Sequence, residues 1–365
     1  MNEILIKLKN INWFYYSLII FLAFVGVVMI FSATSAMENK IFISHISKVF
    51  FGIAIMTFVS LIDVEFWKKY AFYFYFFFLT LLFLASFYGY IGKGSRRWIE
   101  LYGFYLQPSE FMKIALILSL AKFFDEKKIK DAKDYFFLIL PIFLILLPVV
   151  LILKQPDLGT AAIILLFCFF IFFVAGLSWK FFFTIILCLL MIAPYIWSLL
   201  KNYQKQRILT LFNPENDPLG SGYHIIQSQI AVGSGGFFGK GWREGTQSHL
   251  DFLPEKHTDF IFSMLGEEFG FLGTFSVIGL IIIITFVTYN ISNRFNRDHF
   301  KRILGIGLIS NFFFAAMINI SMVIGILPVV GLPLPLVSYG GSSMITYFIG
   351  FGLILSIDRS LKQNY

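Results

Sequence analysis

Long apolar runs alternate with short polar segments along almost the whole chain. Most runs are about 17–25 residues long, the length that an α-helix needs to cross a bilayer. The pattern predicts about ten membrane-spanning helices, at 13–32, 44–62, 70–91, 108–124, 135–153, 158–176, 179–199, 259–288, 303–325 and 338–357. We therefore expect an all-α polytopic integral membrane protein, folded as a single membrane domain over residues 1–365.

Composition supports the same class. The chain is 58% hydrophobic and only 14% charged, whereas about a quarter of the residues of a soluble domain are charged. Its 48 phenylalanines exceed what one soluble core would bury. The net charge of +8 does not indicate a nucleic-acid-binding protein, because the basic residues lie in short segments between apolar runs. Cys168 and Cys188 fall inside apolar runs and have neither disulfide nor metal-ligand spacing.

The distribution of basic residues predicts the orientation. If the N-terminus is cytoplasmic, the short cytoplasmic segments hold more than half of the 29 lysines and arginines, as the positive-inside rule requires. These residues are Lys7, Lys9, Lys68, Lys69, Lys122, Lys127, Lys128, Lys130, Lys133, Lys180, Arg294, Arg297, Lys301, Arg302, Arg359 and Lys362. An even number of spans then places the C-terminus in the cytoplasm as well.

Three segments face outward in this topology. They are 92–110, a large loop at about 200–258, and 325–343, which has the sequence GILPVVGLPLPLVSYGGSS. Proline and glycine interrupt the last segment at membrane depth, where irregular backbone is tolerated mainly when it is buried in protein or lines a water-filled cavity. The chemistry is therefore expected on this face of the membrane.

The stretch LPEKHTDFIFSMLGEE, residues 253–268, places carboxylates at the entry of an apolar helix. Asp259 follows Thr258, and two explanations are open: a capping carboxylate at the helix start, or a general base at the water–lipid boundary. Glu267 and Glu268 lie about two turns deeper. We expect this pair to be structural, with one member contacting a buried cation.

Lys113, in QPSEFMKIALIL at 107–118, lies about one turn into an apolar run. It either snorkels towards water with Glu110 as its local partner or contacts an anion.

A second group of cations lies in GKGSRRWIELYGFYLQPSE, residues 92–110. Lys93, Arg96, Arg97 and the adjacent Trp98 suit a phosphate or pyrophosphate at the membrane surface, because guanidinium groups bind phosphate oxygens bidentately. Anionic lipid headgroups are the alternative ligand.

The stretch GSGGFFGKG, residues 233–241, is similar to a phosphate-binding loop but does not match one. Ser234 stands in place of the first required glycine, and Gly241 in place of the serine or threonine after the lysine. A flexible loop is the prediction, with Lys240 as a candidate substrate contact. His249 and His257 have no zinc-ligand spacing.

Several long motifs, in order, resemble the shape, elongation, division and sporulation (SEDS) family. They are SRRWIELYGFYLQPSEFMKIALIL, KQPDLGTA (154–161), residues 203–268, and GILPVVGLPLPLVSYGGSS. The forms GTQSHLDFLPE and GLPLPLVSYGG are similar to the RodA-type elongation branch rather than the FtsW-type division branch. Arg243, where an apolar residue is expected, and His249, where glutamine is common, depart from the pattern.

The resemblance implies a ten-helix peptidoglycan glycosyltransferase of the bacterial inner membrane that polymerises lipid II during cell elongation. It marks Asp259 as the essential carboxylate, and Lys113 and Trp98 as further functional positions. The implied partners are a class B penicillin-binding protein and other membrane proteins of the elongation complex, with no nucleic acid.

In chemical terms, Asp259 would accept the proton of the attacking 4-hydroxyl group, while Lys113, Arg96 or Arg97 would stabilise the departing polyprenyl pyrophosphate. A divalent cation such as Mg²⁺ or Mn²⁺ would add to that stabilisation, with Asp259 as a candidate ligand. The sequence leaves this metal requirement open, as it leaves open two rival functions: a lipid II flippase and a non-enzymatic scaffold of the elongation machinery.

Overall fold

Helices occupy all ten predicted membrane segments. The computed structural model describes residues 2–34, 39–92, 95–101, 104–127, 135–200, 202–217, 220–250, 252–253 and 255–362. The ten helices are α2 (Trp13–Ala33), α3 (Asn39–Leu61), α4 (Val64–Tyr88), α5 (Pro108–Glu126), α6 (Ile139–Lys154), α7 (Leu158–Val174), α8 (Trp179–Leu199), α12 (Ile261–Asn293), α13 (His299–Val323) and α14 (Ser342–Lys362). The all-α polytopic prediction is confirmed, with boundaries that differ from the expected ones by up to six residues.

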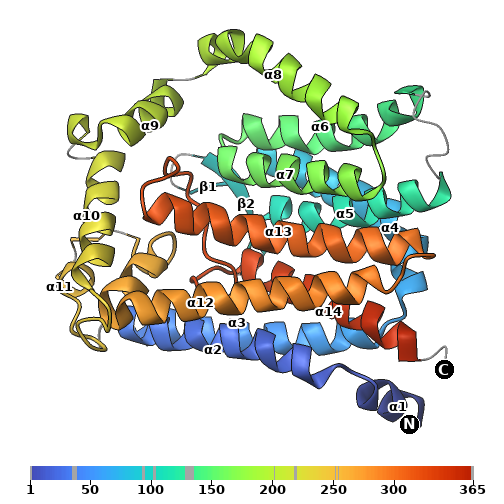
Figure 1. Ribbon diagram of the computed structural model, residues 1–365, viewed down its shortest axis with the longest axis horizontal. Helices are drawn as coiled ribbons and strands as arrows, with labels where there is room; N and C mark the ends of the chain where they lie inside the picture. The colour runs from blue at the N-terminus through green and yellow to red at the C-terminus, as the bar shows by residue number, and fades with distance from the viewer. Residues whose placement is uncertain are drawn as a thin grey trace.

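Burial separates central helices from peripheral ones (Figure 1). The apolar window of α13 is 83% buried and that of α14 is 78% buried, whereas those of α3 and α4 are each 22% buried. A helix that is apolar all round must be covered by protein or by lipid. The peripheral helices therefore present their phenylalanines to the bilayer. Helix α5 is the least apolar of the ten, and its polar residues are shielded because almost every position from Pro108 to Phe124 is buried.

Helix α8 contributes little to the bundle. Figure 1 shows it apart from α6 and α7, followed by α9 (Asn202–Phe212), which leads to α10 (Ser221–Ser234) at one end of the molecule. Leu190 and Met191 are 67% and 68% exposed. These side chains have the chemistry of a lipid-facing helix, since water would not accommodate such an apolar surface.

Helices α3 and α14 run parallel and pack closely along their length. Near one end, Gly341 lies beside Lys48, and at the other end Arg359 reaches Leu61 and Asp63. Between them, a side chain at Gly52 would collide with the ring of Phe348. Close packing of this kind needs small residues at the interface. The pair thus forms a rigid element that joins two polar clusters.

The outward segments contain more regular structure than the sequence indicated. Residues 92–110, expected to be a loop, contain most of a three-stranded antiparallel sheet: β1 (Tyr90–Gly92), β2 (Ser95–Leu101) and β3 (Phe104–Leu106). The large loop carries α9, α10 and the short α11 (Thr246–His249). A further helix, α1 (Asn2–Lys9), precedes α2.

The glycine-rich stretch 233–241 inserts into a break in α12. Gly270 has φ 64° and ψ −156° and interrupts the helix, a conformation that glycine adopts without steric cost. The backbone N–H groups of Lys240 and Gly241 donate to the carbonyls of Glu267 and Glu268 at 3.0 and 3.2 Å. In return, the N–H groups of residues 271 and 272 donate to the carbonyls of residues 236 and 237. The prediction of a flexible loop was wrong here, because the stretch replaces missing helical hydrogen bonds.

Candidate active site

Asp259 lies in a turn, residues 255–260, immediately before α12. We call this segment the Asp259 turn. The N-cap of α12 is Phe260, which makes no side-chain capping bond, and the Thr258 hydroxyl donates to Glu255 instead. Asp259 is therefore not the N-cap residue itself, and both explanations of its carboxylate, complementing the helix dipole and acting as a general base, remain predictions. Its side chain is partly exposed at the end of a membrane helix, which is where a base that receives a proton from substrate must lie.

The segment between α13 and α14, residues 324–341, donates hydrogen bonds to backbone carbonyl oxygens of the Asp259 turn. We call it the α13–α14 loop. The Ser338 hydroxyl donates to the Thr258 carbonyl at 2.6 Å, and the Tyr339 N–H donates to the His257 carbonyl at 2.8 Å. Gly331 has φ +73°, and a side chain built there would approach Asp259 Oδ2 at 3.4 Å. The left-handed backbone at Gly331 thus faces the carboxylate itself.

Asn319, on α13, completes this arrangement. Its buried amide nitrogen donates to the carbonyls of Asp259, at 2.8 Å, and Leu332, at 2.6 Å. One side chain therefore holds the Asp259 turn and the α13–α14 loop together. Asn319, Ser338 and Tyr339 were not predicted as site residues, because an Asn in an apolar run and two residues of a loop motif carry no sign of which carbonyls they contact.

Lys113 is fully buried, with 1% of its side chain exposed. Its ammonium group contacts both carboxylate oxygens of Glu110, at 3.0 and 2.9 Å, and lies 5.7 Å from the ring centroid of Tyr347 on α14. The predicted Glu110 partner is confirmed, but the snorkelling explanation was wrong because the ammonium group does not reach water. Burying two charges carries a desolvation cost that their mutual attraction must offset. The anion-contact role of Lys113 remains a prediction.

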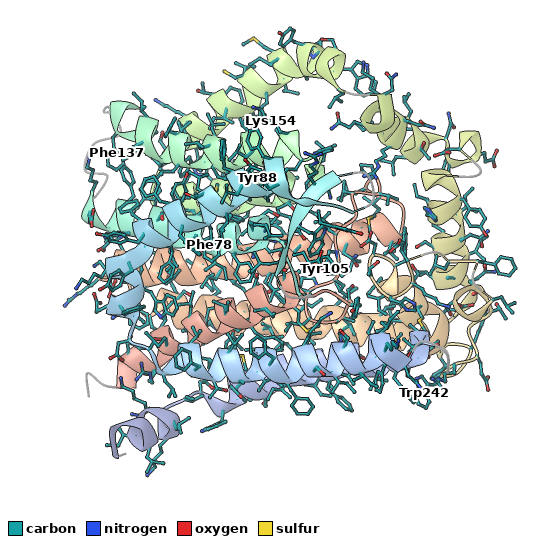
Figure 2. The ribbon with its side chains drawn as sticks, turned by 180° about the vertical axis from the view of Figure 1, so that it is seen from behind. Phe78, Tyr88, Tyr105, Phe137, Lys154 and Trp242 are labelled. Carbon is teal, nitrogen blue, oxygen red and sulfur yellow. The ribbon has the colours of Figure 1, made fainter. Side chains whose placement is uncertain are left out.

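The N-termini of α5 and α14 are tied together one turn before Lys113. The Ser342 hydroxyl accepts from the backbone N–H of Gln107 at 2.9 Å and donates to the carbonyl of Tyr105 at 3.1 Å. Tyr105, labelled in Figure 2, belongs to β3 and is 47% exposed. The helix that carries Lys113 is therefore fixed to the element that follows the α13–α14 loop.

Arg96 and Arg97 do not converge on one ligand position. Successive residues of a strand point to opposite faces, and both arginines lie in β2. Arg96 donates to the carbonyl of Phe87 at 3.0 Å. Arg97 donates to the carbonyls of Gln155 and Pro156 and lies 3.6 Å from Asp157. The two guanidinium groups are thus bound to different helix ends, and their pyrophosphate roles remain predictions.

Trp98 and Lys93 are the remaining members of the group predicted to bind phosphate. Trp98, in β2, is partly exposed and pairs with Tyr90 across the sheet. Lys93 lies outside the described residues.

Lys240 and the glutamate pair fasten the large loop to the bundle. Lys240 contacts Glu267 at 2.8 Å, and Glu267 also accepts from the backbone N–H groups of Gln247 and Ser248, at 2.8 and 3.1 Å. Glu268 accepts from Ser32 on α2 at 2.6 Å. One glutamate, Glu267, does contact a cation as predicted, but Lys240 is 26% exposed, so the cation is not buried. The substrate role of Lys240 stays a prediction, since its ammonium group already serves the loop.

The contacts of Arg243 account for its departure from the family pattern. It donates to the carbonyls of Phe31 and Thr34 at 2.8 and 3.3 Å, and its guanidinium lies 4.4 Å from the Phe31 ring centroid. A cation at the C-terminus of α2 complements the helix dipole. Trp242 lies beside it, at the end of the molecule where the large loop meets α2 (Figure 2).

Within the described ranges, no group of three or more His, Cys, Asp or Glu side chains could hold a metal ion. Asp259 is thus not part of such a cluster among the described residues.

The fold and the site define a class first: this is a polytopic all-α membrane protein whose carboxylate turn is held by an irregular loop at membrane depth. The chain belongs to the FtsW/RodA/SpoVE family, described as "Cell cycle protein", whose model matches residues 12–363. It is 41% identical over 332 residues to the peptidoglycan glycosyltransferase MrdB of Escherichia coli K12, covering 90% of this chain and 86% of the relative. It is 39% identical over 353 residues to the probable peptidoglycan glycosyltransferase FtsW of Trichlorobacter lovleyi, covering 92% and 90%.

Solved structures are also similar. One comes from work on the coordination of polymerization and crosslinking by a peptidoglycan synthase complex, with a TM-score of 0.83, 30% identity, and coverage of 97% of this chain and 99% of that chain. The rod shape determining protein RodA of Thermus thermophilus gives a TM-score of 0.72 and 28% identity, covering 96% and 97%.

Proposed function

We propose that the protein is a peptidoglycan glycosyltransferase that polymerises lipid II with Asp259 as general base. The family, the names of its relatives and the structural similarity support the activity. The observation that carries the role of Asp259 is the Asp259 turn, whose carbonyls are held from Asn319, Ser338 and Tyr339. A base works only when its position relative to the substrate is fixed, and these bonds fix it.

The reaction is a single inverting displacement. The 4-hydroxyl oxygen of the acceptor sugar forms a bond to the anomeric carbon of the donor, and the bond from that carbon to the pyrophosphate oxygen breaks with its electron pair. The hydroxyl proton passes to the Asp259 carboxylate. Lys113, Arg96 or Arg97 stabilises the charge on the departing polyprenyl pyrophosphate.

The orientation and the partners belong to the same proposal. The protein lies in the bacterial cytoplasmic membrane with both termini in the cytoplasm, so that the Asp259 turn faces outward. Its partner is a class B penicillin-binding protein, which supplies the crosslinking that this chain does not perform. Cysteine labelling in a Cys188→Ser background tests the orientation. Ser234→Cys should react from outside and Arg297→Cys should not, and the reverse result contradicts this topology. The predicted cytoplasmic segment around Lys128 lies outside the described residues.

The activity is tested with purified protein and lipid II, with and without the class B penicillin-binding protein, and glycan strands are scored on gels. Strands made with this chain as the only polymerase support the proposal. Movement of lipid II across vesicle membranes without strand formation would favour the flippase, and strands made equally well without this chain would favour the scaffold.

A further inference from the structure

A lysine that the proposed mechanism does not use lies next to the Asp259 turn. Lys48 projects from α3, and its ammonium group donates to the Tyr339 phenol oxygen at 2.9 Å and lies 4.0 Å from the ring centroid. The Ser44 hydroxyl, also on α3, is 3.2 Å from the same phenol oxygen. Tyr339 is the residue whose backbone N–H donates to His257 in the Asp259 turn.

Lys48 differs from Lys113 and Lys240, the two lysines already described near the site, because no carboxylate neutralises its charge among the described residues. Lys113 contacts Glu110, and Lys240 contacts Glu267. Across the described residues, no carboxylate lies within ion-pair distance of Lys48. A charge within a membrane helix is costly when it has no counter-ion, and such residues mark functional sites. The missing counter-ion is therefore expected to come from a ligand.

The surroundings of Lys48 are suited to an anion. The phenol oxygen of Tyr339 accepts from Lys48, and when the Ser44 hydroxyl also donates to it, the phenol hydrogen is available for another acceptor. Gly341 leaves the space beside the Lys48 ammonium group open. Even a Cβ built at Gly341 would lie 3.8 Å from Lys48 Cε and 4.0 Å from Lys48 Nζ. His45, one turn away on α3, is fully buried, and neither ring nitrogen has a hydrogen-bond partner in the described part of the chain. Its ring lies 6.2 Å from that of Tyr339.

We propose that Lys48 and Tyr339 form an oxyanion-binding site of the phosphate class beside the Asp259 turn. Its ligand is the pyrophosphate of the lipid-linked donor, an assignment that rests on the proposed function. The site holds the donor on the α3 side of α14, whereas Lys113 lies on the α5 side near Tyr347.

The test compares Lys48→Gln with Lys48→Arg, Tyr339→Phe and a matched control, Lys40→Gln, which removes an exposed lysine from the same helix. Binding of inorganic pyrophosphate to the purified full-length chain is measured by calorimetry, because this readout requires no turnover. Lys48→Gln should weaken binding about tenfold or more, the size of a charge-assisted hydrogen bond. Tyr339→Phe should weaken it several-fold. Lys48→Arg should retain most of it, and Lys40→Gln should bind like wild type. Pyrophosphate binding that is absent from wild type, or unchanged in both Lys48→Gln and Tyr339→Phe, overturns the site.

A second measurement identifies the source of the anion and separates this proposal from the polymerase assignment. In nanodiscs of phosphatidylcholine, Lys48→Gln should raise the KM for lipid II about tenfold with little change in kcat. If the defect appears only in discs that contain phosphatidylglycerol, the ligand is a lipid headgroup and the donor assignment is overturned. If wild type binds pyrophosphate but makes no strands, the polymerase proposal and the donor assignment fail, and the oxyanion site stands.

Discussion

The two ends of the parallel α3–α14 pair are both polar, but they are built differently. At the end near the chain termini, Arg359 is 1% exposed and contacts Asp63 at 2.7 Å, while Lys7 contacts the same carboxylate at 3.1 Å. At the Asp259 end, Lys48 contacts a phenol, and the nearby backbone is irregular from residue 324 to 341. At the end near the chain termini, the charged groups pair with each other. At the Asp259 end, neutral hydroxyl and amide groups donate hydrogen bonds to backbone carbonyls.

The difference shows how structural charge and functional charge are arranged in this protein. Asp63 lies in the connection between α3 and α4 and joins it to α14 and to the N-terminal segment. Its charge is paired there with Arg359 and Lys7. The contacts from Asn319, Ser338 and Tyr339 go to the backbone of the Asp259 turn, so these contacts do not depend on the Asp259 charge. A carboxylate that must accept a proton is best placed by bonds that its protonation does not alter.

Removing Lys113 should give the largest effect. Lys113→Ala leaves Glu110 buried without its cation, which costs about 3–5 kcal/mol of unfolding free energy. Thermal melting in detergent measures this loss. The double variant Lys113→Met, Glu110→Leu should regain much of the stability, while turnover stays about 100-fold or more below wild type because a leaving-group contact is gone. A stable and active double variant would show that the ion pair is structural only.

Asp259→Asn separates the chemistry from the fold. Since the N-cap of α12 is Phe260 and Asn319, Ser338 and Tyr339 hold backbone carbonyls of the turn, the melting temperature should stay near that of wild type. The rate of lipid II polymerisation should fall about 100-fold or more, the size of a general-base contribution. Binding to the penicillin-binding protein serves as the control for folding. Glycan strands at near wild-type rate would exclude Asp259 as the base.

Two serines allow a direct comparison of the ends. Ser338 donates to Thr258 at the Asp259 end, and Ser356 donates to the carbonyl of Ile62 at the other end. Either change to alanine should cost about 1 kcal/mol of stability, the usual contribution of one hydrogen bond. Only Ser338→Ala should also slow polymerisation, by about tenfold, because it loosens the turn that carries the base. Equal turnover by the two variants contradicts the positioning role of the α13–α14 loop.

The smallest effect concerns acid pH. Burial raises the pKa of the Asp63 carboxyl, but the hydrogen bonds from Arg359 and Lys7 outweigh burial, so its pKa lies below the ordinary value. A lowered folded-state pKa contributes stability that is present above the unfolded value, near 4, and is lost as the pH falls through the folded value. Melting temperatures of wild type and Asp63→Asn should therefore differ at pH 7 and converge as the pH falls through the lowered folded-state pKa. The effect is modest because the Asp63 side chain is more than half exposed.

The sequence was sufficient for the membrane fold and for individual candidates, because both depend on local information. Apolar runs of spanning length located the ten helices, and the carboxylate at the entry of α12 identified Asp259. It was not sufficient for side-chain partners. Arg96 and Arg97 are adjacent in the chain, yet an unpredicted strand turns them to opposite faces. The glycines of 233–241 are a flexible loop by composition, yet they complete α12 at Gly270.

The sequence alone determined that this protein lies in a bilayer, because no soluble core would bury that many apolar residues. It also determined the family, because several long motifs occur in order. What only the tertiary structure decided is which polar groups serve the architecture and which remain for chemistry. Hydrogen bonds between Asn319 and Asp259, Ser338 and Thr258, or Lys48 and Tyr339 join residues 60, 80 and 291 positions apart. Contacts over such separations follow from how the helices pack, and no local pattern of residues encodes them.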